Sequence, residues 1–174
     1  MMNSEQFKDA FRKLASGVSV VSFWAGADMH GFAATSLTSV SMNPPTALFC
    51  IGRQSRSFSH LKLGKVVGIS ILGAHQKSLS KRFSSGLPRG SFDDIDIVSG
   101  SNGAPMIGGA LATLEGLLIQ QHPVGDNVIC VCSLLSAHTR PDGHPLIYAS
   151  REYRELGAVA KDTEIPVKQP SEEG

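Results

Sequence analysis

Hydrophobic residues follow a helical spacing in two parts of the chain. Residues 7–14 place Phe, Ala and Leu side chains three or four positions apart, which predicts an amphipathic helix. Asn3 or Ser4 can cap the first amides of this helix, and Gly17 can end it in a left-handed conformation. Residues 74–84 repeat the spacing and predict a second short helix.

Most other hydrophobic residues lie in short segments with the character of β-strands. These segments are residues 18–23, 46–51, 65–72, 110–121, 127–139 and 145–149. Turn sequences such as Gly26-Ala27-Asp28 and Asn43-Pro44-Pro45 separate them, and Pro123 and Gly125 would join 110–121 to 127–139 as a long hairpin. The pattern predicts about six or seven strands with two or three helices. Because turns and not helices join the strands, we expect a mainly β fold, a barrel or a sandwich.

The composition is that of one folded domain. A chain of 174 residues has room for one ordinary core, and 41% hydrophobic against 18% charged residues excludes a disordered chain. We expect the domain to span residues 1–157. Residues 158–174 lose the hydrophobic pattern and predict a flexible C-terminal tail.

The charge balance restricts the classes of partner. A formal net charge of +1 argues against a general binder of nucleic acid or of anionic membranes, which needs clustered cations. No apolar signal segment opens the chain, and no run approaches the ~20 apolar residues of a membrane span. The 3 cysteines have no regular framework, which fits a reducing compartment. We therefore expect a cytoplasmic protein.

The sequence predicts neither a metal centre nor a covalent nucleophile. No two of the histidines stand three or four residues apart, so the usual ligand spacing is missing. Cys130 and Cys132 alternate in an apolar strand, so both side chains should pack on one face. Cys50 also lies in an apolar strand, and no Gly-x-Ser-x-Gly sequence marks a serine nucleophile.

Two polar segments carry groups that suit a phosphate ester. The first is crowded with hydroxyls, at Thr35, Ser36, Thr38, Ser39 and Ser41. The second places a guanidinium between two hydroxyls, at Ser55, Arg56 and Ser57. Hydroxyls, amides and an arginine fork bind a phosphomonoester or a pyrophosphate, whereas a Walker loop and a Gly-x-Gly-x-x-Gly turn are absent. On composition alone, a hydroxyl-rich strand edge followed by a solvated loop explains both segments better than a phosphate-binding site does.

The same residues carry a resemblance to a known family. The segment Gly31-Phe32-Ala33-Ala34-Thr35-Ser36-Leu37-Thr38-Ser39-Val40-Ser41-Met42-Asn43-Pro44-Pro45, preceded by His30, resembles the signature of the flavin reductase-like domain family. Members of this family include the small reductase components of two-component flavin monooxygenases. Further segments match in the right order, at residues 11–18, 67–72, 76–83, 104–112 and 145–153. The resemblance covers residues 7 to 157.

The resemblance implies an FMN-binding split β-barrel that works as a homodimer, with the flavin close to the dimer interface. The implied activity is an NAD(P)H-dependent flavin reductase, which transfers hydride from NADH or NADPH to FMN or FAD and supplies a partner monooxygenase. The flavin carries this chemistry, so no side chain is required as acid or base. The resemblance places Thr35, Ser36, Thr38, Ser39 and Ser41 along the flavin, Ser55, Arg56 and Ser57 at its phosphate, and Gln76 and Phe83 near the site as support and apolar wall.

One departure from the family pattern bears on function. Many members have Gly-Asp-His after the long strand, with the histidine near the nicotinamide, whereas this chain has Gly125-Asp126-Asn127. The amide of Asn127 can form hydrogen bonds but carries no charge. A non-catalytic flavin-binding or flavin-carrying protein is therefore an alternative interpretation. An interaction protein that uses the dimer surface and a cofactorless hydrolase are further alternatives, and the sequence leaves FMN against FAD and NADH against NADPH open.

Overall fold

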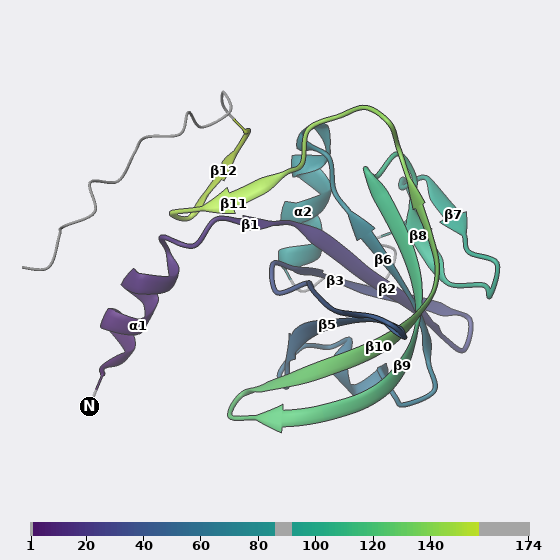
Figure 1. Ribbon diagram of the computed structural model, residues 1–174, viewed down its shortest axis with the longest axis horizontal. Coiled ribbons are helices and arrows are strands. Elements are labelled where there is room, and N and C mark those ends of the chain that lie inside the picture. The colour runs from purple at the N-terminus through teal and green to yellow at the C-terminus, as the bar shows by residue number, and fades with distance from the viewer. Residues whose placement is uncertain (1, 86–91, 157–174) are drawn as a thin grey trace, which may run out of the picture.

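The computed structural model describes residues 2–85 and 92–156, and it is mainly β, as predicted (Figure 1). Its helical segments are α1 (Ser4–Phe11), η1 (Phe58–His60), η2 (Ala74–Gln76) and α2 (Lys77–Ser84). Its strands are β1 (Ser16–Gly17), β2 (Ser19–Ala25), β3 (Asp28–Ala34), β4 (Thr38–Met42), β5 (Pro45–Gly52), β6 (Val66–Ile71), β7 (Ile97–Ser99), β8 (Pro105–Ile107), β9 (Ala112–Val124), β10 (Asn127–Thr139), β11 (Ile147–Ala149) and β12 (Glu152–Arg154).

The main sheet has seven antiparallel strands in the order β3-β2-β6-β9-β10-β5-β4. The sheet curls until its end strand β3 approaches β5 (Figure 1). Over the described residues the pairing includes no ladder between β3 and β5, so the barrel stays open there. This opening confirms the split-barrel architecture that the resemblance implied, and it is where the site lies.

The predicted long hairpin is confirmed and is longer than expected. β9 runs on through Pro123 to Val124, and Gly125 and Asp126 alone form the turn to Asn127. Gly125 has a φ of 57°, a conformation that glycine adopts without strain. Pro123 is tolerated because the β6 ladder on the other side of β9 ends at Leu117, so no donor is needed at Pro123 on that side.

The core has two parts, one on each face of the main sheet. The first fills the barrel and includes Phe23, Phe49 and Leu118, all fully buried. The second lies between the outer face of β2 and α2 and includes Val20 and Phe83. Residues 19–23 of β2 are buried on both faces as a result, which explains why this strand is more hydrophobic than a half-exposed strand.

The cysteine pair of β10 packs as predicted. Cys130 and Cys132 are both 0% exposed inside the barrel. Burial raises the pKa of Cys130 to about 11 and that of Cys132 to about 12. Both thiols are therefore protonated near neutral pH and unsuited to nucleophilic chemistry.

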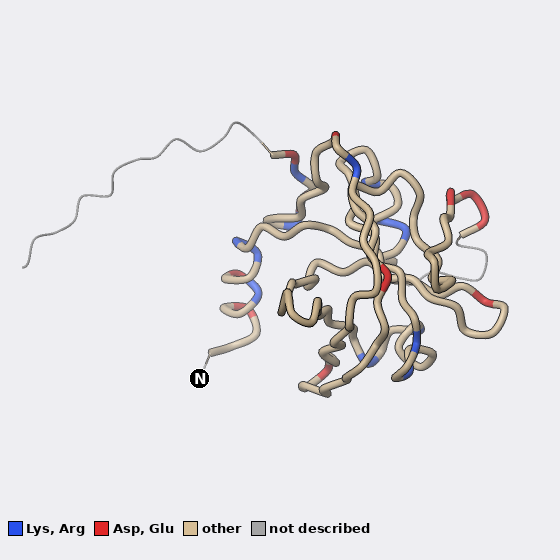
Figure 2. The backbone as a smooth tube through the Cα atoms, turned by 45° about the vertical axis from the view of Figure 1, so that its right-hand side comes forward, with Lys and Arg blue, Asp and Glu red and all other residues tan. Residues whose placement is uncertain are grey.

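The N-terminal helix begins as predicted but ends earlier. The Asn3 side chain accepts from the Gln6 amide at 2.8 Å, while the Gln6 side chain accepts from the Asn3 amide. The expectation that Gly17 ends the helix was wrong, because Gly17 pairs with Ile147 as part of β1. Helix α1 stands away from the barrel and has no buried residue (Figures 1 and 2).

The C-terminal part forms one more hairpin than predicted. The last predicted strand, 145–149, is observed as β11, and it pairs with β12 and with β1 in a small sheet. The predicted tail at 158–174 lies outside the described residues. No helix within 2–85 and 92–156 combines the length and the apolar character needed to cross a bilayer.

Candidate functional site

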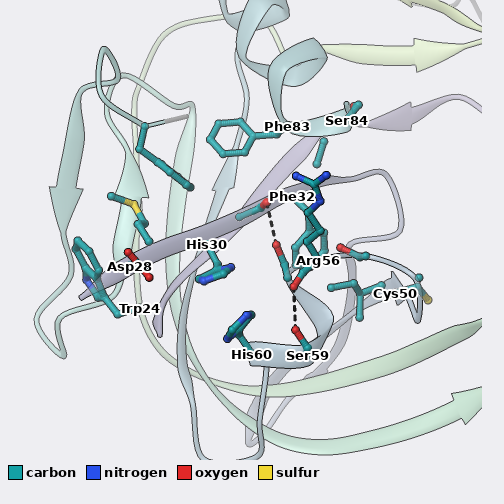
Figure 3. Close-up of a pocket in the computed structure, with 18 of the residues that line it drawn as sticks. Trp24, Asp28, His30, Phe32, Cys50, Arg56, Ser59, His60, Phe83 and Ser84 are labelled. Atoms are coloured by element: carbon teal, nitrogen blue, oxygen red, sulfur yellow. Dashed lines mark hydrogen bonds between the residues drawn. The ribbon is translucent and has the colours of Figure 1, made fainter. Parts of the chain in front are cut away.

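A pocket of about 1070 Å³ opens at the split between β3 and β5 (Figure 3). β3 forms one wall, the end of β5 and the following loop form a second, and the end of α2 with Phe92 and Asp93 forms a third. Small-molecule sites usually enclose roughly 300–1,000 Å³. The pocket therefore has room for a large ligand.

The loop after β5 is folded back on itself and fastened at both sides. The Ser55 amide donates to the Gly52 carbonyl at 2.9 Å, and the Phe58 amide donates to the Ser55 carbonyl at 3.0 Å. On one side the Arg53 amide donates to Asp126 O at 2.9 Å, which ties the loop to the β9–β10 turn. On the other side the Ser57 hydroxyl donates to the Gly31 carbonyl of β3 at 3.2 Å.

This folding brings the predicted phosphate-binding residues to the pocket. Ser55, Arg56 and Ser57 all line it, with Arg56 exposed (Figure 3). Because the Ser57 hydroxyl already donates to β3, its main effect is to hold the loop in place. The Arg56 guanidinium and the Ser55 hydroxyl are the groups here with the chemistry to bind a phosphate.

Two aromatic rings form an apolar wall above β3. Phe83 is 3% exposed, and its ring lies 5.1 Å from that of Phe92 at an angle of 61°. A Cβ at Gly31 would lie 3.0 Å from Phe92 and 3.1 Å from Phe83. Glycine at position 31 thus lets the rings approach the strand, and Phe83 lines the pocket.

A pair of histidines lies on the opposite side of β3 from this aromatic wall. The His30 and His60 ring centroids are 4.2 Å apart, and His30 also stacks on Phe23 at 5.7 Å (Figure 3). Burial lowers the pKa of His30 and the neighbouring His60 lowers it further, while Asp28 acts in the opposite direction. His30 is therefore uncharged near neutral pH.

The hydroxyl-rich segment lies at the rim of the pocket and beyond it. Residues 35–37 connect β3 to β4, and the Ser36 hydroxyl accepts from the amide of pocket-lining Cys50 at 2.8 Å. This bond ties the connection to β5 just beyond Leu48, where the pairing between β4 and β5 stops. Thr35 is exposed in the same connection. The others are exposed on the edge strand β4, outside the pocket lining: Thr38, Ser39 and Ser41.

Two further predicted residues do not line the pocket. Gln76 is 5% exposed, and its amide accepts from the Gly73 amide at 3.0 Å and donates to the Gly108 carbonyl at 2.9 Å. These bonds hold η2 against the segment after β8. Asn127 is exposed at the start of β10, where it pairs with the pocket-lining Gly52 and donates to the Asp126 side chain at 2.8 Å.

Sequence reasoning missed several lining residues, notably Trp24, Asp28, His60 and Phe92. The two-residue turn after Ala25 brings Trp24 and Asp28 to one end of the pocket, which the turn sequence could have indicated. His60 and Phe92 reach the pocket only through tertiary packing. Across 2–85 and 92–156, no cluster of three or more His, Cys, Asp or Glu side chains could hold a metal ion.

The residues present fit a flavin. Arg56 and Ser55 suit its phosphate, and Phe83 with Phe92 suits a flat apolar ring. In antiparallel strands both backbone groups of a residue point to the same side. Because the Gly31 carbonyl faces the pocket, where Ser57 reaches it, the N–H and C=O of Ala33, two residues further along β3, face the same open edge. Such an edge can bond the polar rim of a flavin ring.

Comparison with known proteins agrees with this geometry. The flavin reductase like domain matches residues 11–157. The actinorhodin polyketide dimerase of Streptomyces coelicolor is 32% identical over 157 residues, which cover 88% of this chain and 86% of that protein. The FMN reductase (NADH) RutF of Agrobacterium fabrum is 30% identical over 159 residues, with 88% of each chain covered.

A solved structure gives the same result for the fold. BorF, the flavin reductase component of a bacterial two-component tryptophan halogenase, superimposes with a TM-score of 0.81 at 33% identity. The match covers 90% of this chain and 100% of BorF. With a domain match over most of the sequence, the same barrel and a pocket suited to flavin, the chain belongs to the flavin reductase-like domain family.

Proposed function

We propose that this protein is a flavin reductase that uses NADH to reduce FMN or FAD. The observation that carries the proposal is the pocket at the split, which sets Arg56 and Ser55 against the aromatic wall of Phe83 and Phe92. The name FMN reductase (NADH) of the Agrobacterium relative supports the same activity and the choice of NADH.

The chain's own residues bind and orient the reactants. When bound, the flavin supplies the hydride acceptor, so catalysis rests on how the two partners are positioned. Arg56 and Ser55 would hold the flavin phosphate. Ser36 fixes the β3–β4 connection at the rim of the pocket, while Phe83 and Phe92 would exclude water from one face of the flavin ring.

We further propose that the reduced flavin is passed to a partner monooxygenase. BorF, which shares this fold, is the reductase component of a two-component halogenase. The rim of the pocket is formed by exposed residues, which would let a flavin enter and leave. We place the reaction in the cytoplasm, where Cys50, Cys130 and Cys132 would remain the free thiols that the structure shows.

We also propose a homodimer. Helix α1 exposes Phe7 by 47% and Phe11 by 57%, and the edge strand β4 exposes Val40 by 53% and Met42 by 93%. Exposed apolar surface on a projecting helix and on an edge strand favours burial against a second copy. Because β4 also carries Thr38, Ser39 and Ser41, dimerisation would bring the hydroxyls predicted to lie along the flavin close to the interface.

Replacing Phe11 with glutamate should weaken this dimer at least about tenfold, because a charge would enter its apolar contact. Phe11 stacks on Phe7 at 4.5 Å, so both rings act together. Sedimentation equilibrium measures the dissociation constant of the dimer. Lys13→Glu, an exposed charge change just after α1, is the matched control. Equal dissociation constants for both variants would exclude α1 from the interface.

Oxidation of NADH and NADPH, followed by absorbance with and without FMN or FAD, tests the proposed activity. Flavin-dependent turnover is expected, faster with NADH. If the folded protein binds flavin but oxidises neither nucleotide, the non-catalytic carrier is the correct interpretation. If it neither binds flavin nor turns over, the flavin site itself is refuted.

Replacing Asn127 with histidine should lower the KM for NADH about threefold at pH 6, because a partly protonated imidazole would face an anionic nucleotide. The decrease in the KM for NADH should be smaller at pH 8, where the imidazole is neutral. Steady-state kinetics at both pH values measure it. His122→Asn, at an exposed position near the same turn, serves as control and should leave the KM as it is. An unaltered KM in Asn127→His would show that position 127 does not face the nucleotide.

A further inference from the structure

The pocket extends well beyond the predicted phosphate-binding loop. The Ser57 hydroxyl bonds to the Gly31 carbonyl, so this loop lies level with Gly31 on β3. Ser36 and the connection to β4 lie past the C-terminal end of the strand. In the other direction the pocket continues to Asp28, roughly 10 Å further at ~3.3 Å per residue.

FMN ends at its phosphate. With that phosphate at Arg56 and the flavin ring against Phe83 and Phe92, on the opposite side of β3 from the two histidines, FMN would leave the stretch beside Asp28 empty. We define this stretch as the far arm, lined by Trp24, Asp28, His30 and His60. Figure 3 shows Trp24 and Asp28 at its end, with the two histidines between them and Arg56.

The far arm has the chemistry of a site for a flat, polar aromatic group. The Trp24 indole is 39% exposed, and His60 is also exposed, so both offer ring surface to a ligand. His30 is uncharged near neutral pH, because burial and the adjacent His60 lower its pKa. The uncharged His30 ring therefore contributes stacking surface, while Asp28 can accept hydrogen bonds from an amino group or from ribose hydroxyls.

We propose that the far arm binds an adenylate group, the unit that FAD and NADH share. The inference rests on the proposed function, since it takes Arg56 as the phosphate-binding residue. FAD is the expected source, because its adenylate follows directly from the phosphate at Arg56. The protein would then prefer FAD to FMN, a choice that the family assignment leaves open.

Calorimetric titration of FAD and of FMN, without nicotinamide nucleotide, tests the proposal. The wild-type protein should bind FAD about tenfold more tightly than FMN, since stacking of a base is worth about 1–3 kcal/mol. His60→Ala should reduce this preference about fivefold. His122→Ala, an exposed histidine outside the pocket, should keep the wild-type preference. A second variant of the far arm is Asp28→Asn, which keeps the shape of the arm.

Kinetics with FMN as the flavin distinguish the two sources. If His60→Ala raises the KM for NADH and leaves the FAD preference alone, the adenylate in the far arm is that of NADH. If neither the FAD preference nor the KM for NADH responds to His60→Ala and Asp28→Asn, the far arm binds no adenylate, although flavin binding and reduction stand. Loss of all flavin binding in the wild-type protein would instead overturn both the proposed function and this inference.

Discussion

Replacing Arg56 with alanine should raise the dissociation constants of FMN and FAD about 10- to 100-fold. A charge-assisted hydrogen bond to a phosphate is worth about 1.5–3 kcal/mol, and each 1.4 kcal/mol is a factor of about ten. The fold should survive, because Arg56 is exposed on a loop. Calorimetric titration of both flavins measures the effect.

Arg53→Ala is the matched control for this experiment. Arg53 belongs to the same loop and is exposed, but it does not line the pocket. Its removal should change flavin affinity less than about twofold, because salt screens the field of an exposed charge. The flavin affinity of Arg56→Lys should lie between those of Arg53→Ala and Arg56→Ala, since lysine keeps the charge and loses the planar fork. Equal flavin affinity in Arg53→Ala and Arg56→Ala would rule out Arg56 as the phosphate-binding residue.

Replacing Glu115 with glutamine should lower the free energy of unfolding by about 3 kcal/mol at pH 7. Glu115 is 0% exposed in β9. Its carboxylate accepts from the Asn102 amide at 3.0 Å, the Asn102 side chain at 2.9 Å and the Ala104 amide at 2.9 Å. A glutamine would turn an N–H group toward these donors, leaving at least one of them unsatisfied in the core.

The stability that Glu115 contributes should depend on pH. Burial by itself would raise the pKa of Glu115, but the hydrogen bonds from Ala104 and Asn102 outweigh it and hold the pKa below its ordinary value. A lowered pKa in the folded state means that the contribution is complete above the unfolded pKa of about 4.3. The stabilising contribution of Glu115 is lost as the pH falls through the lower pKa that this residue has in the folded state. The gap between wild type and Glu115→Gln should therefore narrow in acid.

Urea denaturation at fixed protein concentration and at several pH values between about 3 and 7 measures this difference. Glu152→Gln is the control, because Glu152 is an exposed glutamate in another strand, β12. It should cost less than about 0.5 kcal/mol. A Glu115→Gln protein as stable as this control at pH 7 would contradict the role of the carboxylate. Circular dichroism before denaturation establishes that both variants are folded.

Glu115 also shows what sequence reasoning can and cannot find. A glutamate in an apolar strand is visible in the sequence. Its hydrogen-bond partners, however, lie in the Asn102–Ala104 turn, which β8 separates from β9 along the chain. Gly100 approaches so closely that a Cβ there would lie 2.3 Å from Oε1 of Glu115. The requirement for glycine at that position comes from tertiary contact and from no local turn rule.

The loop proposed to bind the flavin phosphate could be predicted further than the rest of the site. Ser55, Arg56 and Ser57 were singled out by their chemistry, and all three line the pocket. Gln76 was expected near the site, yet both ends of its amide are bonded to the backbone away from the pocket lining. A polar residue in a family motif can serve the fold or the ligand, and only its hydrogen-bond partners distinguish these roles.

The sequence by itself determined many local elements of this protein: six of the twelve strands that the structure describes, the long β9–β10 hairpin, the packed Cys130–Cys132 pair and, through its motifs, the family. These depend on the period of hydrophobic residues and on turn residues, which act over a few positions. Short elements such as β1 and β12 escaped prediction, because two or three residues form a strand only when a distant partner pairs with them. The tertiary structure alone decided where the pocket lies and that His30 meets His60, since the curling of the sheet brings β3 to the loop after β5, and no local pattern encodes that closure.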